Sequence, residues 1–352
     1  MLTVRRFKTE DLLKIRSMNP GMAEDLMSHG NLFPASAVVA VDEAETFFGA
    51  AYILMTQSFR ESEKREVPRA FIRGAFQAVH GTDQEIEASA LLLESLKEFT
   101  EKLQQEFPKR RIILQLFGDA GALSYQEYLM SYGFQPKALM TRMERDLSDL
   151  SDLPEHFSFR LIEGAAEDAP GFQKKMKHFL KKVYDFVNPF DDEMLALQKE
   201  EENEGPALSK LTFYSSLDHW DADAYRALSS EAFQGMPDSD EDIRFLLDHG
   251  AKVYFAEEQG VLQAAVMTYR IDPETAATEN ICCSLRYRRM GLTTALLSEA
   301  LLRLSEAGYS RARLHIFSDN TPAFMLYQKL GYEITGNLIE YHFEVSPSIR
   351  DY

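Results

Sequence analysis

Two short motifs each occur twice in this 352-residue chain, about 200 residues apart. Ser89-Ala90-Leu91-Leu92 corresponds to Thr294-Ala295-Leu296-Leu297, an offset of 205 residues, and Tyr132-Gly133-Phe134 corresponds to Leu330-Gly331-Tyr332, an offset of 198. Solenoid repeats are far shorter, at about 20–50 residues. The repeat therefore predicts two copies of one domain, over residues 1–148 and 210–352, joined by a connecting segment at 149–209.

The same order of secondary structure is expected in both copies, from alternating apolar residues in strands and apolar residues at helical spacing in helices. In the first copy we expect strands at 2–7, 36–41, 47–57, 70–79, 111–117 and 137–147 and helices at 10–18, 85–107 and 123–131. In the second copy we expect strands at 211–215, 252–257, 261–270, 277–285, 311–316 and 332–344 and helices at 221–233, 292–307 and 323–330. The fold class is therefore α/β with a mixed sheet.

The connecting segment differs in character from both copies. A strand is expected at 157–162 and an amphipathic helix at 171–187, with lysines at 174, 175, 177, 181 and 182. We interpret these lysines as a solvated helix face, and a patch for an anionic ligand is the alternative.

The charge of the chain disfavours nucleic acid as a partner. Its 38 Lys and Arg against 56 Asp and Glu give a net charge of −18, whereas phosphate contacts need clustered basic side chains. No apolar run reaches the about 18 residues that a membrane span needs, and no signal peptide is expected. The two cysteines, Cys282 and Cys283, are adjacent and cannot join distant segments. These features predict a cytoplasmic protein without membrane or nucleic-acid partners.

The stretch from Ile281 to Leu297 predicts a strand, a basic turn containing Gly291, and an apolar helix. The first N–H groups of a helix lack partners within the helix, and the helix dipole favours an anion there. A glycine lets backbone amides approach that anion closely. With Arg288 and Arg289 in the turn, the junction predicts a cradle for a diphosphate. Neither a P-loop nor a dinucleotide-binding glycine motif is present.

These residues resemble the GNAT acetyltransferase superfamily. Its pyrophosphate-binding signature is similar to Arg288-x-x-Gly291-x-Thr293, with Thr in place of the last small residue. A second family pattern is similar to Asn320-x-x-Ala323-x-x-x-Tyr327-x-Lys329-x-Gly331-Tyr332. The resemblance implies two tandem GNAT folds. It also implies that acetyl-CoA lies between the strand ending at Leu285 and the strand at 311–316.

The resemblance also implies roles for individual residues. The backbone of Cys283 and Leu285 would bind the pantetheine arm, and amides of 289–294 would hold the diphosphate. The expected cofactor-binding residues are Cys283, Ser284, Leu285, Arg288, Arg289, Met290, Gly291, Leu292, Thr293, Thr294 and Asn320. Asn320 could also cap its helix.

Tyr327 is the expected general acid, because a phenol can protonate the leaving thiolate. Glu279 is the expected base, since its even spacing from Ile281 and Cys283 would place all three side chains on one face of the strand. His315 and His342 are the alternatives. The two cysteines are expected to be packed or to present their backbone, not to act as nucleophiles. No metal site is expected.

The first copy lacks this constellation. Alignment on Ser89 puts Asp83 at the Arg288 position and Ile86 at the Gly291 position, and the turn carries Asp83, Glu85 and Glu87, which repel a diphosphate. Counting from Gly133 puts Leu129 at the Tyr327 position and Ala122 at the Asn320 position. A degenerate first copy is therefore expected.

The resulting hypothesis is an acetyl-CoA-dependent N-acetyltransferase that acts on a primary amine of a small molecule or peptide. Its negative charge would attract a cationic acceptor. The alternative is a non-catalytic acyl-CoA-binding sensor or scaffold. An aminoacyl transferase that uses charged tRNA ranks below both, because it needs a basic surface stripe. A homodimer is compatible with the sequence. The loops expected at the acceptor, 235–241 and 271–278, contain no motif that identifies it.

Overall fold

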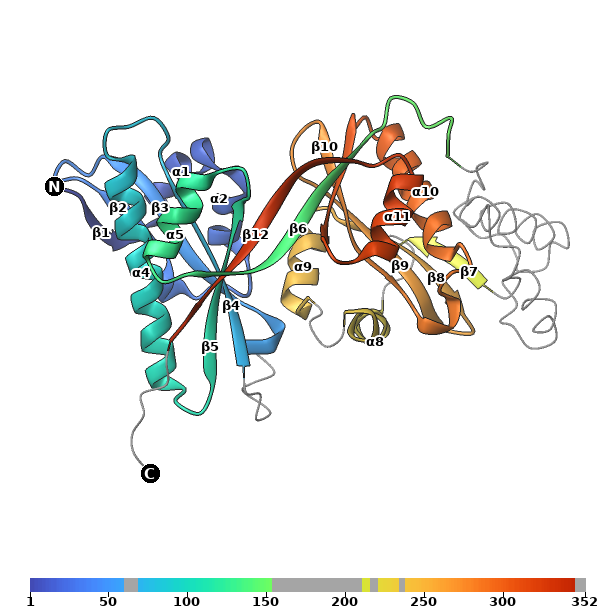
Figure 1. Ribbon diagram of the computed structural model, residues 1–352, viewed down its shortest axis with the longest axis horizontal. Helices are drawn as coiled ribbons and strands as arrows, with labels where there is room; N and C mark the ends of the chain where they lie inside the picture. Colours follow the sequence, from blue (N-terminus) through green and yellow to red (C-terminus); the bar gives the residue numbers. More distant parts are fainter. Residues whose placement is uncertain (60–68, 154–210, 216–220, 234–237, 346–352) are drawn as a thin grey trace, which may run out of the picture. The chain divides into compact units, whose positions relative to one another are not determined.

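The structure is a computed structural model that describes residues 1–59, 69–153, 211–215, 221–233 and 238–345. It divides into two compact units. Unit 1 comprises Met1–Leu139, Asp238–Phe245 and Asn337–Tyr352, and unit 2 comprises Met140–Pro237 and Leu246–Gly336. Each unit is built on a mixed sheet covered by helices (Figure 1).

In the part of unit 1 that the structure describes, six strands lie in the order β1-β2-β3-β4-β5-β12. The strands are β1 (Thr3–Arg6), β2 (Val38–Val41), β3 (Phe47–Met55), β4 (Arg69–Ala78), β5 (Arg111–Asp119) and β12 (Glu333–Glu344). The helices are α1 (Leu12–Met18), α2 (Pro20–Ser28), α4 (Glu85–Glu106) and α5 (Leu123–Ser131). Only β4 and β5 are parallel; the other paired neighbours described in this unit are antiparallel.

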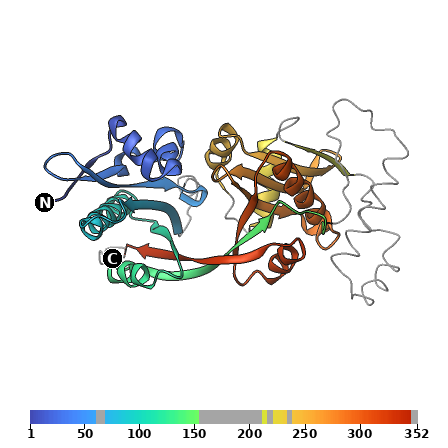
Figure 2. The same cartoon turned by 90° about the horizontal axis from the view of Figure 1, so that it is seen from above.

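The two faces of the unit 1 sheet bury different side chains because successive strand residues point to opposite faces. One face packs Ile53, Ile72 and Leu114 against Leu92 and Leu96 of α4. The opposite face packs strand residues such as Tyr52 against α1 and α2. Figure 2 shows α1 and α2 on the other side of these strands from α4. Segment 238–245 joins this unit through the buried Asn31, whose amide donates to Ser239 Oγ (2.7 Å) and Asp242 Oδ1 (2.8 Å).

The described residues of unit 2 form six strands in the order β6-β11-β10-β9-β8-β7. The strands are β6 (Gln135–Asp146), β7 (Leu211–Ser215), β8 (Lys252–Glu258), β9 (Val261–Arg270), β10 (Thr275–Cys283) and β11 (Arg311–Phe317). The helices are α8 (Ala222–Ala232), α10 (Leu292–Glu306) and α11 (Thr321–Lys329), and α9 (Asp240–Asp248) passes from unit 1 to unit 2 after Phe245. Gln259-Gly260 turns β8 into β9, and both residues have positive φ (52° and 82°).

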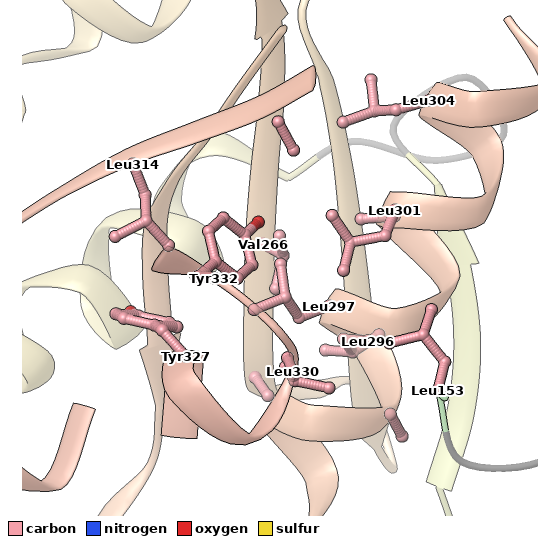
Figure 3. Packing of buried hydrophobic residues seen from close by; sticks show 14 of the residues in the cluster. Leu153, Val266, Leu296, Leu297, Leu301, Leu304, Leu314, Tyr327, Leu330 and Tyr332 are labelled. Carbon is pink, nitrogen blue, oxygen red and sulfur yellow. The ribbon is translucent and has the colours of Figure 1, made fainter. Parts of the chain in front are cut away.

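The core of unit 2 lies between the sheet and the helices α10 and α11. Val266 of β9 and Leu314 of β11 pack against Leu297 and Leu301 of α10 and Tyr327 of α11. Figure 3 shows these side chains converging in one cluster. α8 contacts β9 and β10. The turn that is expected to hold a diphosphate lies between β10 and α10.

The last strands of the two copies are exchanged between the units. β6, which ends the first copy, pairs antiparallel with β11 from Asp146↔Arg311 to Met140↔Phe317. β12, which ends the second copy, pairs antiparallel with β5 from Leu338↔Asp119 to Glu344↔Ile113. The expected division at residue 148 therefore does not coincide with the compact units. Both copies end in a strand of the same kind, so the sequence does not show which sheet each strand joins.

The backbone confirms that the two copies share one fold. Ala122 and Asn320 precede α5 and α11 with nearly the same dihedral angles, φ −87° ψ 74° and φ −81° ψ 67°. Gly133 and Gly331 follow these helices with φ of 87° and 74°. The N–H of Phe134 donates to Leu129 O (3.1 Å), just as that of Tyr332 donates to Tyr327 O (3.0 Å). The alignment that placed Leu129 opposite Tyr327 is thus reproduced by the hydrogen bonding.

The expected strands and helices in the described ranges are found within a few residues of their predicted bounds. α2 and α9 were not expected from the apolar pattern. The expected strand at 157–162, the basic helix at 171–187 and residues 235–237 of the loop at 235–241 lie outside the described residues. No helix among the described residues is long and apolar enough to cross a membrane.

Candidate active site

The parallel strands β10 and β11 separate before either of them ends. Their paired residues are Thr275↔Arg311, Ala276↔Ala312 and Ala277↔Arg313, whereas β10 continues to Cys283 and β11 to Phe317. Beyond Ala277, the edge of β10 that faces β11 therefore has no ladder partner in the described sheet. Backbone N–H and C=O groups on such an edge can bind an extended ligand as an added strand.

A β-bulge in β10 changes which face its side chains occupy. The register with β9 shifts between Glu279 and Cys282, and Asn280 has a φ of 50°. Before the bulge, Thr278 points into the unit 2 core, where its hydroxyl lies 2.6 Å from that of Tyr332. After the bulge, Ile281 and Cys283 pack against the same core. Glu279 follows Thr278 in the strand and therefore points to the opposite face. Because the bulge inserts an extra residue, Ile281 and Cys283 lie on the core face and not on the face of Glu279.

The expectation that Glu279 shares a face with Ile281 and Cys283 is thus wrong, although Glu279 does lie at the split between the strands. Its carboxylate is held by both neighbouring strands. Tyr269 Oη on β9 donates to Oε2 (2.7 Å), and His315 Nδ1 on β11 lies 2.8 Å from Oε1. The side chains of Glu279 and His315 are 27% and 24% exposed, so the pair can still be reached by a ligand. The sequence suggested His315 only as an alternative to Glu279, and the structure makes it the partner of Glu279.

Tyr327 approaches the split from the helical side. Its ring lies next to Leu314 and Tyr332 (Figure 3), with a distance of 5.9 Å between the two tyrosine ring centroids. Burial raises the pKa of the Tyr327 phenol well above its ordinary value, and the nearby Glu279 carboxylate raises it further. The phenol therefore stays protonated at neutral pH and can act as a proton donor.

The turn before α10 is shaped to present backbone amides. Arg289 and Gly291 have positive φ values of 63° and 80°, a conformation that glycine adopts without strain. Within the described residues, the N–H groups of Met290, Gly291, Leu292, Thr293 and Thr294 make no hydrogen bond. The first helical hydrogen bond is donated by Ala295 to Gly291 O (3.0 Å). These donors and the positive end of α10 form the kind of anion site that the sequence predicted.

The chain at the end of β10 contacts β9 on one side and the Arg288 side chain of the turn on the other. Ser284 N–H donates to Gln263 O of β9 (2.8 Å), and Ser284 Oγ lies 2.8 Å from Gln263 Oε1. Because alternate residues of a strand point their backbone groups to opposite edges, Cys283 presents its own to the split. Leu285, the other predicted contact, lies beyond β10 in a short 3-10 turn. Arg288 Nε donates to Cys283 O (3.4 Å), and the exposed Arg288 and Arg289 add positive charge.

The two thiols are poor nucleophiles in this setting. Burial raises the pKa of Cys282 to about 12. Burial also raises that of Cys283 to about 11, while a hydrogen bond with Thr293 and the charge of Arg288 act in the opposite direction. Since the thiolate is the reactive form, these values favour a structural role for both cysteines.

The two remaining predicted residues, Asn320 and His342, make contacts of other kinds. Asn320 caps α11, its Oδ1 accepting from Ala323 N–H (3.4 Å), so its role as a helix cap is confirmed. His342 is in the part of β12 that belongs to unit 1, where its Nε2 lies 2.6 Å from Glu340 Oε1. It is therefore part of a separate polar cluster and not of the Glu279 pair.

Unit 1 differs at each corresponding position. β4 and β5 remain paired as far as Arg73↔Gln115, and these residues occupy the register positions of Glu279 and His315. In the turn before α4, the carboxylate of Glu85 takes up a backbone donor. Its Oε2 accepts from Gly81 N–H (2.8 Å), and its Oε1 contacts His80 Nδ1 (2.9 Å). A negative side chain thus occupies the region where unit 2 presents amides.

These features can be compared with known proteins. The sequence profile of the Acetyltransferase (GNAT) family matches residues 214–332, which contain the split strands, the turn and Tyr327. This part of the chain is a GNAT domain. Among curated proteins, none matches the sequence.

Solved structures of GNAT proteins resemble the chain over nearly its whole length. A tandem GNAT protein from the clavulanic acid biosynthesis pathway has a TM-score of 0.60 at 12% identity, covering 99% of this chain and 100% of its own. A GCN5-related N-acetyltransferase from Sphaerobacter thermophilus has a TM-score of 0.53 at 13% identity, covering 99% and 97%. At this identity the likeness establishes the fold, which is two GNAT folds in tandem.

Proposed function

We propose that the chain is an N-acetyltransferase in which unit 2 transfers an acetyl group from acetyl-CoA to a primary amine. The observation that carries the proposal is the convergence of three features at one place. These are the split between β10 and β11, the amide-presenting turn at 289–294, and the Glu279 and Tyr327 side chains on opposite sides of the split.

The residues of the turn fit a CoA diphosphate. The N–H groups of residues 290–294 would donate to its oxygens, and Arg288 and Arg289 would add positive charge. Gly291 has no Cβ to block the approach. Cys283 and Leu285 would offer backbone groups to the pantetheine arm along the split. In unit 1, Glu85 occupies the turn before α4, and therefore only unit 2 is expected to bind the cofactor.

The acid–base roles follow from the surroundings of the two side chains. Bound acetyl-CoA supplies a thioester carbonyl that a deprotonated amine can attack. Glu279 would accept a proton from the acceptor ammonium, with Tyr269 and His315 holding its two oxygens in place. Tyr327, kept protonated by burial, would donate a proton toward the leaving sulfur.

The acceptor is proposed to be cationic. Glu279 lies at the split, and the whole chain has a net charge of −18, which attracts positively charged molecules. Polyamines, aminoglycosides and basic peptide amines are suitable chemical classes to test.

Calorimetric titration with acetyl-CoA and a screen of amines for free-thiol release test the proposal together. We expect acetyl-CoA to bind. At a ligand concentration of a hundred times Kd, it should raise the free energy of unfolding by about 2.7 kcal/mol. Arg288→Ala should weaken binding, whereas Lys109→Ala, in a loop of unit 1, should not. Acetyl-CoA binding without thiol release from any amine would favour an acyl-CoA sensor, and absence of binding would refute both functions.

A further inference from the structure

A carboxylate of the chain itself accepts a hydrogen bond from one of the backbone N–H groups that the proposed function assigns to cofactor binding. Leu285 N–H donates to Glu231 Oε1 at 2.8 Å. Glu231 lies in the last turn of α8, a helix that contacts β9 and β10. Leu285 begins the short 3-10 turn that follows β10, so its N–H lies where β10 leads into the amide-presenting turn.

The neighbouring backbone group is also held by a side chain. The carbonyl of Cys283, which faces the split, accepts from Arg288 Nε at 3.4 Å. Glu231 and Arg288 thus pair with one donor and one acceptor at the end of β10. An extended amide-containing chain bound from the split toward the turn would require the same two groups.

The charge of Glu231 also matters for an anionic ligand. The Glu231 carboxylate raises the pKa of the Cys283 thiol, whereas Thr293 and Arg288 of the turn lower it. Glu231 and the turn therefore act on the same group. Like charges repel each other, so the carboxylate would oppose a diphosphate bound at the turn.

We propose that Glu231 is an internal competitor in the cofactor site: its carboxylate substitutes for the pantetheine carbonyl at Leu285 N–H and must leave before acyl-CoA binds. The inference rests on the proposed function for the identity of the ligand. Glu231 is exposed, so its side chain can move into solvent without unpacking α8. Buried Tyr225 and Leu228 anchor that helix instead.

Competition of this kind lowers the apparent affinity in proportion to the fraction of molecules in which Leu285 N–H is available. Removing the carboxylate should therefore strengthen cofactor binding. Glu231→Ala removes the acceptor altogether, whereas Glu231→Gln keeps an oxygen acceptor but removes the charge. We expect the Kd for CoA to fall by about 5- to 20-fold in Glu231→Ala and by a smaller factor in Glu231→Gln.

Titration calorimetry with CoA on the full-length chain measures these constants. Asp223→Asn is the matched control, because Asp223 is exposed on the same helix, pairs with Arg226 at 2.9 Å and carries the same charge. It lies eight residues from Glu231, about 12 Å along the helix. Its Kd should equal that of the unmodified chain. Equal tightening in Asp223→Asn and Glu231→Gln would reduce the effect to net charge and overturn the proposal.

A second measurement examines the contact without any cofactor. The Leu285 amide proton should resonate downfield in the unmodified chain, because it donates to a charged acceptor, and should move upfield in Glu231→Ala. An unchanged Leu285 signal would overturn the contact itself. A changed signal with equal or weaker CoA binding in Glu231→Ala would overturn the competition while leaving the proposed function intact. If neither the unmodified chain nor any variant binds CoA, the competition and the proposed function both fail.

Discussion

The Glu279 carboxylate and the His315 imidazole are 2.8 Å apart at the point where the backbone pairing of β10 and β11 has stopped. The last paired residues are Ala277 and Arg313, so Glu279 and His315 would be the next residues facing each other on the same side of the ladder. A side-chain contact thus spans the beginning of the split. It holds a carboxylate where an incoming amine would need a proton acceptor.

This relationship predicts distinct effects for the two residues. Glu279→Gln should lower kcat by about 10²- to 10⁴-fold, because the amide cannot accept the proton, while the Kd for acetyl-CoA stays unchanged. His315→Ala should cause a smaller loss, since His315 positions the carboxylate without accepting the proton itself. His315→Gln should restore much of the activity by supplying a donor. Steady-state kinetics at several pH values would measure this, and a loss in His315→Ala as large as that in Glu279→Gln would contradict it.

Tyr327 gives a second prediction. Tyr327→Phe should lower kcat by about 10²-fold and leave acetyl-CoA affinity unchanged. Because burial raises the pKa of the phenol above its ordinary value, no loss of activity from its ionisation should occur up to pH 10.

Tyr332→Phe is the matched control for that variant. Tyr332 is buried beside Tyr327, but its hydroxyl contacts Thr278 at 2.6 Å and does not belong to the proposed proton path. It should lose about 1 kcal/mol of stability and keep its kcat. Retained activity in Tyr327→Phe would instead support a binding protein without acid catalysis by this residue.

The exchanged strands give a third prediction, about stability. Tyr341 of β12 is fully buried in the core of unit 1, and Met143 of β6 is fully buried in that of unit 2. Tyr341→Ala should cost about 3–5 kcal/mol and Met143→Ala about 2–5 kcal/mol, through the cavities that they create. Hydrogen exchange should then show loss of protection in β5 for Tyr341→Ala and in β11 for Met143→Ala.

Tyr341→Phe separates packing from hydrogen bonding in that test. The Tyr341 hydroxyl is buried without a hydrogen-bond partner among the described residues, so its removal should be nearly neutral. If Tyr341→Ala reduced protection in β11 and spared β5, the assignment of this strand to unit 1 would be wrong.

The buried thiol of Cys282 gives a prediction about pH. Burial raises its pKa to about 12, whereas an unfolded cysteine titrates at about 8.5. Above pH 8.5 the unfolded chain therefore loses this proton first, and the free energy of unfolding falls by about 1.4 kcal/mol per pH unit toward pH 12. The stability gained from a protonated thiol is fully present below pH 8.5.

Denaturant unfolding at pH 7.5 to 10 measures this slope. Cys282→Ala should unfold with a shallower pH dependence than the unmodified chain, because the other titrating groups are common to both. In the folded protein at pH 8, both thiols should react slowly with a disulfide reagent, and unfolding should make them reactive. Identical pH slopes for the two proteins would contradict the buried, protonated state of Cys282.

Much of the fold is determined by local sequence. The apolar periodicity of residues 85–107 and 292–307 was sufficient to predict α4 and α10, and the alternation in 261–270 predicted β9. The offsets between the repeated motifs predicted two equivalent domains. Gly291 was identified because a residue without a Cβ lets backbone amides approach an anion, and Asn320 because Asn suits a helix cap. Each of these properties depends on residues that are neighbours along the chain.

Tertiary structure alone decided the rest. The exchange of β6 and β12 depends on which of two equivalent sheets each strand joins, and their own residues suit either one. The bulge at Asn280 moved Glu279 to the other face of β10, although spacing along a regular strand placed it with Cys283. The contacts of Glu279 with Tyr269 and His315, and that of Glu231 with Leu285, join residues from different strands and helices. Such contacts arise only when the chain folds, because they depend on strand register and helix position and not on local propensity.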